Sequence, residues 1–166
     1  MALNTKIVAS IVAVLTGSGD HATPRAEPQF IESIELLTGT GASQADKVFS
    51  DQRTLTASAT EDLDLAGVLT DLLGATITFA KIKAILIKAS PANTNDVIVG
   101  GGTNGWFGCF SDLSDKIVIK PGGFFLWAAP VSGVAVTAGT VDILKVANSA
   151  GSTSVVFDII IIGTSA

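Results

Sequence analysis

The chain has 166 residues, of which 48% are hydrophobic and only 15% are charged, and its net charge is −5. An ordinary globular domain carries about 25% charged residues, so the surface of this chain is poor in charge, in line with its mean hydropathy of +0.55. This composition excludes an intrinsically disordered chain, which combines low hydrophobicity with high net charge. It also disfavours a freely soluble monomer and favours one domain that assembles with other subunits.

Local sequence disfavours three more classes of protein: membrane-spanning, nucleic-acid-binding and secreted proteins. The longest apolar stretches, residues 7–15 and 155–162, are shorter than the roughly 20 residues that span a bilayer. An isoelectric point near 4.6 and the absence of a Lys/Arg cluster disfavour nucleic-acid binding. Residues 6–19 imitate a short secretory signal, but only Lys6 precedes the apolar run and no clean cleavage site follows it. We therefore expect no nucleic-acid partner and no membrane partner.

Residues 1–45 are predicted to form an N-terminal arm with short elements of its own. Residues 7–15 predict a strand or short helix that packs on the domain or on a neighbouring subunit. The Gly, Ser and Pro residues between 17 and 28 predict a loop. Apolar residues at 30, 31, 34 and 37 follow with the spacing of a helix.

Residues 46–166 predict a β domain. Period-two alternation begins at residue 47, and turn signals then recur every 8 to 12 residues between short β-rich segments. After residue 75 these predicted strands are 75–80, 81–89, 96–99, 106–110, 116–120, 123–129, 133–137, 141–147 and 154–162. Residues 66–74 predict one short helical insertion that ends at Gly74. Since no crossover helix follows, the strands are expected to be antiparallel, and the predicted fold is an all-β, jelly-roll-like β-sandwich with an arm.

The last predicted strand is apolar on both sides. Residues 155, 157, 159 and 161 point one way and residues 156, 158, 160 and 162 the other, and only Asp158 is polar. A sandwich buries one face of each sheet. The second face of this strand is therefore expected to meet something else, and another subunit is the natural candidate.

The inventory of catalytic residues is thin. The single histidine, His21, lies in the predicted arm loop without ligands or triad partners at a suitable spacing. The single cysteine, Cys109, has apolar neighbours, which indicates a buried structural thiol, and its use fits the bacterial cytosol better than secretion. We expect no catalytic, cofactor-binding or metal-binding residues, no cofactor and no enzymatic activity.

Three other groups of residues allow a functional and a structural interpretation. Acidic residues near Asp62 and Asp112 lack the spacing of a calcium loop, and turn chemistry explains them more simply. The glycines of 100–105 lack the Lys-Ser/Thr of a phosphate-binding loop, and an inter-strand turn is the simpler interpretation. The aromatic residues can form a sugar-binding platform, but their strand context favours the core or a subunit interface; they are Trp106, Phe107, Phe124, Phe125 and Trp127.

Several segments resemble the small virion proteins of tailed bacteriophages. They are RTLTASATEDLDLAG (53–67), KIKAILIK (81–88), IKPGGFFL (119–126), VTAGT (136–140) and DIIIIGTS (158–165). The resemblance covers roughly residues 50–166 and marks no catalytic site. It implies a structural component of the phage particle, and within that class a capsid decoration (cement) protein. The resemblance thus implies a homotrimer on the exterior of the phage head, assembled in the host bacterial cytoplasm, with the major capsid protein as partner.

Two alternatives remain open from the sequence. A tail-fibre or spike domain that binds a host surface glycan predicts Trp106, Phe107 or Trp127 exposed near polar loops, whereas decoration predicts them buried. A polysaccharide-degrading enzyme predicts a cleft lined by two carboxylates, such as Asp62 and Asp112, about 5 to 9.5 Å apart.

Overall fold

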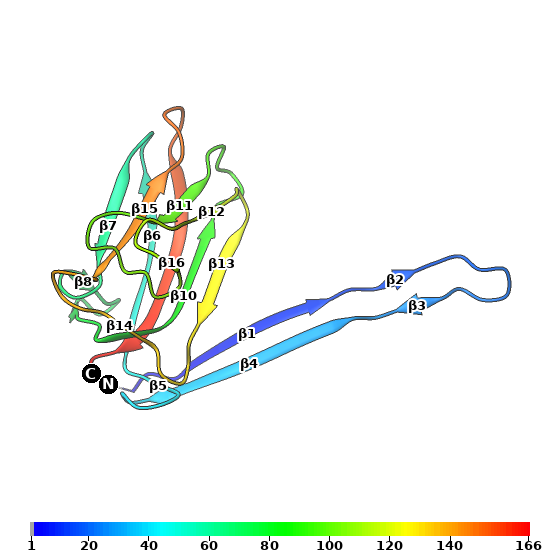
Figure 1. Cartoon of the computed structure of the whole chain (residues 1–166), viewed down its shortest axis with the longest axis horizontal. Helices are drawn as coiled ribbons and strands as arrows, with labels where there is room; N and C mark the ends of the chain where they lie inside the picture. The colour runs from blue at the N-terminus through cyan, green and yellow to red at the C-terminus, as the bar shows by residue number, and fades with distance from the viewer. Residues whose placement is uncertain (1) are drawn as a thin grey trace.

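The computed structural model describes residues 2–166 and has two parts, a β-sandwich-like body and a long hairpin arm that projects from its base (Figure 1). Among the described residues all regular structure is β-structure. The prediction of an all-β fold is therefore confirmed.

The first sheet of the body has the strand order β13-β10-β16-β6, and β14 also pairs with β10. All of its pairs are antiparallel. Its strands are β6 (Lys47–Leu55), β10 (Lys81–Ala89), β13 (Phe124–Ala128), β14 (Val134–Ala135) and β16 (Val155–Thr164).

The second sheet has the order β12-β11-β15-β7, also antiparallel throughout. Its strands are β7 (Thr60–Asp64), β11 (Val97–Gly100), β12 (Lys116–Ile119) and β15 (Ile143–Asn148). Across the two sheets the pairing is nested: β6 pairs with β16, β7 with β15, β10 with β13 and β11 with β12. Two short strands, β8 (Leu69–Thr70) and β9 (Thr76–Ile77), pair with each other beside the body.

The core lies between the two sheets. Inward-pointing side chains of β16 meet those of the second sheet in one cluster, and every second residue of these strands contributes. The sheet residues at its centre are Phe49, Ile85, Ile87, Phe157, Ile159 and Ile161 on one side and Leu63, Val97, Val99, Leu144 and Val146 on the other. The alternation that the sequence predicted for the last strand thus places its odd-numbered residues in the core.

The arm is a single antiparallel hairpin. β1 (Thr5–Val12) pairs with β4 (Gln29–Thr38), and β2 (Leu15–Thr16) pairs with β3 (Arg25–Ala26) in the same register. β5 (Gln44–Ala45) adds a short parallel pair to β4 and leads into the body. The hairpin leaves the body near both chain termini and extends well beyond it (Figure 1).

Two helix predictions are wrong. The helical spacing at 30–37 belongs to the strand β4, because β1 offers a cross-strand partner for every residue from Gln29 to Leu36 and such tertiary pairing overrides local periodicity. The predicted insertion at 66–74 is a turn and the β8–β9 hairpin. There the Asp71 side chain accepts hydrogen bonds from the backbone of Leu73 and Ala75, and Gly74 has φ = 84° as a turn residue.

Most strand predictions in the body are confirmed within a few residues, including 81–89 as β10 and 154–162 as β16. The predicted strand at 106–110 is wrong. It lies in the long connection between β11 and β12, where Gly105 forms only an isolated bridge to Ile143. Antiparallel pairing is confirmed for both sheets of the body.

Candidate functional site

The outer face of the first sheet, the side turned away from the core, carries three rows of side chains across its four strands. The strand registers align Phe124, Lys88, Asp158 and Gln52 in the top row, Leu126, Leu86, Ile160 and Ser50 in the middle row, and Ala128, Ala84, Ile162 and Val48 in the bottom row. The top row is mostly polar, whereas the two lower rows are almost entirely apolar.

The bottom row is covered by this chain's own arm. Ala84 and Ile162 form a second hydrophobic cluster with Leu36 and Ala45, against which Ile7 and Ile34 also pack. Ile162 is consequently only 6% exposed. The sequence expectation that the second face of the last strand needs cover is confirmed at this row, but the cover comes from the same chain.

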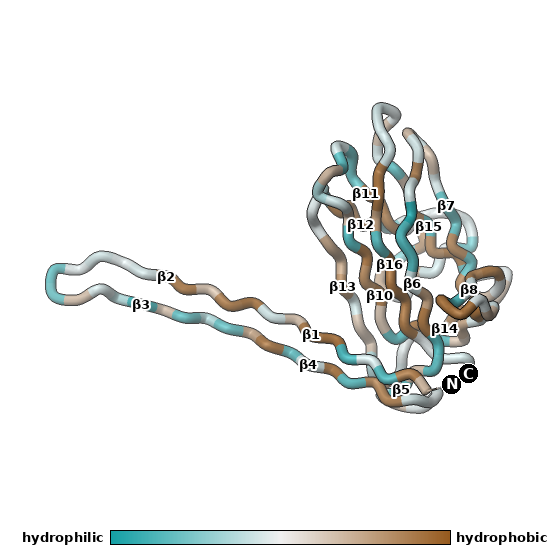
Figure 2. The backbone as a smooth tube through the Cα atoms, turned by 180° about the vertical axis from the view of Figure 1, so that it is seen from behind, coloured by the Kyte–Doolittle hydropathy of each residue, from teal (hydrophilic) through white to brown (hydrophobic). Residues whose placement is uncertain are grey.

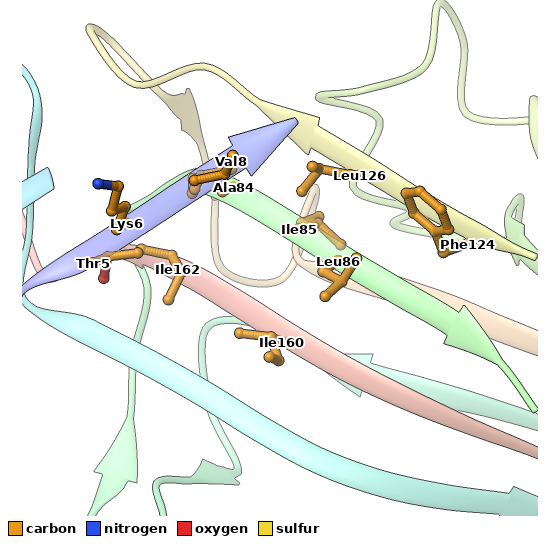
Figure 3. A pocket seen from close by; sticks show the side chains of 11 residues that line it. Thr5, Lys6, Val8, Ala84, Ile85, Leu86, Phe124, Leu126, Ile160 and Ile162 are labelled. Atoms are coloured by element: carbon orange, nitrogen blue, oxygen red, sulfur yellow. The ribbon is translucent and has the colours of Figure 1, made fainter. Parts of the chain in front are cut away.

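The middle row remains open. It forms the floor of a groove of about 350 Å³ between the base of β1 and the sheet, which Figure 3 shows from close by. Leu86, Leu126 and Ile160 lie on this floor, and Phe124 stands at its edge with 67% of its surface exposed. We call these four residues, which come from three adjacent strands, the outer groove.

Both faces of the arm carry exposed apolar side chains, and Val8, Val12 and Ile31 lie on one of them. Only the other face continues from the part of the arm that packs on the body. Residues directly opposite in the ladder share a face, so Thr5/Leu36, Ile7/Ile34, Ala9/Glu32, Ile11/Phe30 and Leu15/Ala26 lie on the same side of the hairpin. At the base this side packs on the body. Farther out it is uncovered, with Ile11 72% and Phe30 61% exposed, and Figure 2 shows hydrophobic residues continuing along this part of the arm. Residues 9–32 are called the distal arm below.

A buried lysine fixes the start of the arm. The side chain of Lys83 is 1% exposed, and its Nζ donates hydrogen bonds to the carbonyl oxygens of Gly41, Pro130 and Val131 at 3.3, 3.2 and 2.8 Å. It thereby joins β10 to the segment between arm and body and to the loop after β13. The register shift of β10 between Ile82 and Ala84 turns Lys83 into this position. Sequence reasoning missed this residue; β10 also contains Lys81 and Lys88, so its sequence does not single out Lys83 as the buried lysine.

The five aromatic residues singled out from the sequence all lie in the body, and three of them pack in or against its core. Trp106 is buried, donates its Nε1–H to the carbonyl oxygen of Ala135 at 3.0 Å, and packs edge-to-face on Trp127 with ring centroids 5.6 Å apart. Trp127 and Phe125 are half-buried against the core. Phe107 and Phe124 are exposed, and of these Phe124 belongs to the outer groove.

The single histidine and the single cysteine lie far from each other. His21 is exposed in the tip loop of the arm between β2 and β3. Cys109 is half-buried against the core, and burial raises the pKa of its thiol to about 12. The sequence predicted a buried structural thiol; the side chain is half-buried, and the raised pKa agrees with a structural rather than a reactive thiol.

The acidic and glycine-rich segments build turns. Asp112 accepts hydrogen bonds from the backbone and hydroxyl of Ser114, which lower the pKa of its carboxyl group, whereas Asp62 lies on β7 opposite Lys145. The glycines at 100–102 all have φ between 75° and 117° and carry the chain from β11 into the following loop. Within residues 2–166 there is no group of three His, Cys, Asp or Glu side chains placed to hold a metal ion.

The described part of the chain contains no helix that is long and apolar enough to cross a membrane. Neither a protein-family model nor a curated protein sequence matches the chain. The surface formed by the outer groove and the distal arm is therefore the feature from which a function is argued.

Proposed function

We propose that the chain is a non-enzymatic structural protein of a tailed-bacteriophage particle, a capsid decoration (cement) protein that binds the head lattice as a homotrimer. The observation that carries the proposal is a projecting hairpin with an uncovered apolar face next to an uncovered apolar groove. Surfaces of this kind mark protein–protein contact. The sequence resemblance to small virion proteins supplies the class of particle, and the head exterior is the location proposed.

The arm has a physical need for a partner. A two-stranded hairpin is at best marginally stable in water by itself, and residues 9–32 extend beyond the body that covers the arm's base. An arm that gains its cover from neighbouring molecules links them, which is the mechanical task of a cement protein. The partners proposed are other copies of this chain and the major capsid protein.

We also propose that the sandwich-like body is a jelly roll. The eight long strands of the body pair in a nested order: the first with the last, the second with the seventh, the third with the sixth and the fourth with the fifth. This order supports the topology, because a jelly roll is a long hairpin rolled into two four-stranded sheets. Jelly rolls are common in viral capsid proteins and in lectins, so this feature agrees with a virion role without deciding the place in the particle.

Electron cryomicroscopy of intact particles tests the function. We expect density for the body and arm at regular positions on the outside of the head, in contact with major capsid subunits. Density confined to the tail, with none on the head lattice, refutes decoration and favours the glycan-binding tail-fibre alternative. Of the three aromatic residues that this alternative needs exposed, Trp106 is buried and Trp127 is half-buried, whereas Phe107 is exposed. A platform of several exposed rings is therefore not supported.

A binding experiment adds a matched control. Particles that lack the chain are incubated with the purified wild-type protein or with a variant whose residues 9–32 are replaced by a two-residue turn. If the arm links neighbouring subunits, the shortened variant protects heads from heat less well than the wild-type chain. Equal protection by both proteins excludes a role for the arm in cementing.

A further inference from the structure

We propose that the distal arm of one copy of this chain docks on the outer groove of a second copy. This inference rests on the self-association in the proposed function and names the two surfaces that would form it. It is independent of whether the assembled particle carries the protein on its head or on its tail.

The two surfaces are chemically matched because each continues a contact that already exists. The base of the arm's apolar face, through Ile7 and Ile34, packs on the bottom row of the sheet face at Ala84 and Ile162. The uncovered part of the arm continues that same face outward with Ile11 and Phe30. The uncovered part of the sheet face continues from this bottom row along the same strands into the outer groove. The arm of a second copy therefore extends the packing already present.

The chain's own distal arm does not reach its own groove. Residues 9–17 and their partners 24–32 extend away from the body in both whole-chain views (Figures 1 and 2). At about 3.4 Å per residue this segment is about 30 Å long. The strand β10 below the groove has 9 residues, and its part at Ala84 is covered by the chain's own arm. A neighbour's distal arm therefore lies along the open part, from Leu86 onward, with only part of its length.

One acidic residue on the arm and one lysine on the sheet face set the alignment. Glu32 is the one charged residue on the apolar face of the distal arm, two residues from Phe30. Lys88 is the one cation in the three rows described above, two residues from Leu86 on the same strand. Both spacings are about 7 Å, so Phe30 seated over Leu86 brings Glu32 next to Lys88.

Both charges are available for this pairing. Glu32 and Lys88 are exposed and, within residues 2–166, neither takes part in an ion pair. Asp158, the neighbour of Lys88 in the top row, instead accepts a hydrogen bond from Gln52 at 2.7 Å. Each copy offers one arm and one groove. A contact between two different surfaces gives a reciprocal pair, a ring where the rotation closes, or an open filament where it does not, and the proposed homotrimer corresponds to a ring of three copies.

Disulfide trapping tests the contact in the full chain. The double variant Phe30→Cys/Leu86→Cys is oxidised in dilute solution and analysed by non-reducing electrophoresis. The matched control is Gln29→Cys/Leu86→Cys, because Gln29 lies at the same height of the arm on the opposite face. We expect cross-linked oligomers from the first variant and several-fold fewer from the control. Equal cross-linking of both, or none, overturns the inference.

A charge exchange provides a second, independent measurement. By sedimentation velocity, Glu32→Lys and Lys88→Glu are each expected to weaken self-association by about 10-fold, and the double exchange is expected to restore it. Unchanged association in the single variants, or no restoration in the double variant, overturns the proposed contact. If the protein self-associates through another surface, both tests fail while head binding persists, which separates this inference from the proposed function.

Discussion

Replacement of Lys83 by methionine tests how the arm is held on the body. Methionine keeps the length and most of the volume of the side chain but donates no hydrogen bond. The carbonyl oxygen of Pro130 retains a hydrogen bond from the backbone N–H of Ser43 at 3.1 Å. The carbonyl oxygens of Gly41 and Val131 lose the lysine and have no other hydrogen-bond donor among the described residues.

The magnitude follows from these two carbonyl groups. A hydrogen bond from a charged donor contributes about 1.5–3 kcal/mol. Two effects reduce the loss: Gly41 and Val131 are exposed residues, so water replaces part of the interaction, and a buried ammonium no longer has to be desolvated. We therefore expect Lys83→Met to lower the free energy of unfolding by about 1–3 kcal/mol. Lys81→Met is the matched control on the same strand, and a change of about 0.5 kcal/mol or less is expected there, as for an ordinary surface substitution.

Urea unfolding followed by tryptophan fluorescence measures the loss, and hydrogen exchange locates it. We expect faster exchange in residues 39–45 and 129–133, which the lysine joins. Equal stability of Lys83→Met and Lys81→Met, with unchanged exchange in these segments, would refute the reasoning.

The pKa of Lys83 gives the same prediction a pH dependence. Burial, and to a smaller extent the charge of Lys81, lower this pKa below its ordinary value of 10.5. Between the lowered pKa and 10.5 the unfolded chain binds more protons than the folded chain, so the stability of the wild type relative to Lys83→Met rises with pH in this window. Below the lowered pKa the difference is constant; a difference that falls as pH rises toward 10.5 contradicts the assignment.

Three further outcomes are expected. Asn148→Ala is expected to lower the free energy of unfolding by about 2–3 kcal/mol in chemical denaturation. The reason is that the buried Nδ2 donates hydrogen bonds to the carbonyl oxygens of Thr56 and Thr153 at 3.0 and 2.7 Å. A loss below about 0.5 kcal/mol contradicts this. Because the pKa of Cys109 is raised to about 12 from 9.0, its thiol reacts roughly 1,000-fold more slowly than a free thiol at pH 8. The unfolded chain loses this proton at lower pH than the folded chain, so the free energy of unfolding falls as pH rises above 9. Rapid labelling of the folded chain with a thiol reagent, or no such fall relative to Cys109→Ser, is the contrary result. Trp106→Phe costs about 2–3 kcal/mol in thermal and urea unfolding by removing the hydrogen bond to Ala135 and leaving a cavity; unchanged stability refutes the packing described for this ring.

The strands of the body were predictable because local chemistry determines them. Alternating apolar residues in β16 fit a pleated strand with one face in the core, and the Pro121–Gly123 turn separates β12 from β13 at the position where the sequence places it. The absence of a crossover helix was enough to predict antiparallel sheets, as observed. The prediction that β16 needs cover on both faces also came from its sequence pattern.

The failures occurred where partners distant in the chain decide the structure. The spacing of 30–37 fits a helix as well as a strand, and only the pairing of Phe30 with Ile11 and Ile34 with Ile7 selects the strand. Residues 66–74 contain helix formers, but Asp71 closes a turn and Leu69 pairs with Ile77. Helix propensity is a weak preference of a few tenths of a kcal/mol per residue, so such pairing overrides it.

The candidate surface also has some properties that the sequence determined and others that the tertiary structure decided. The sequence by itself determined that the chain has too little charge for its surface and that its last strand is apolar on both faces. The tertiary structure decided which of these residues are covered: Ile162 lies beneath the arm's base, whereas Ile160, one row higher, lies in the open groove. The physical reason is that periodicity specifies the face on which a side chain lies, but the exposure of that face depends on segments more than 100 residues away in the chain.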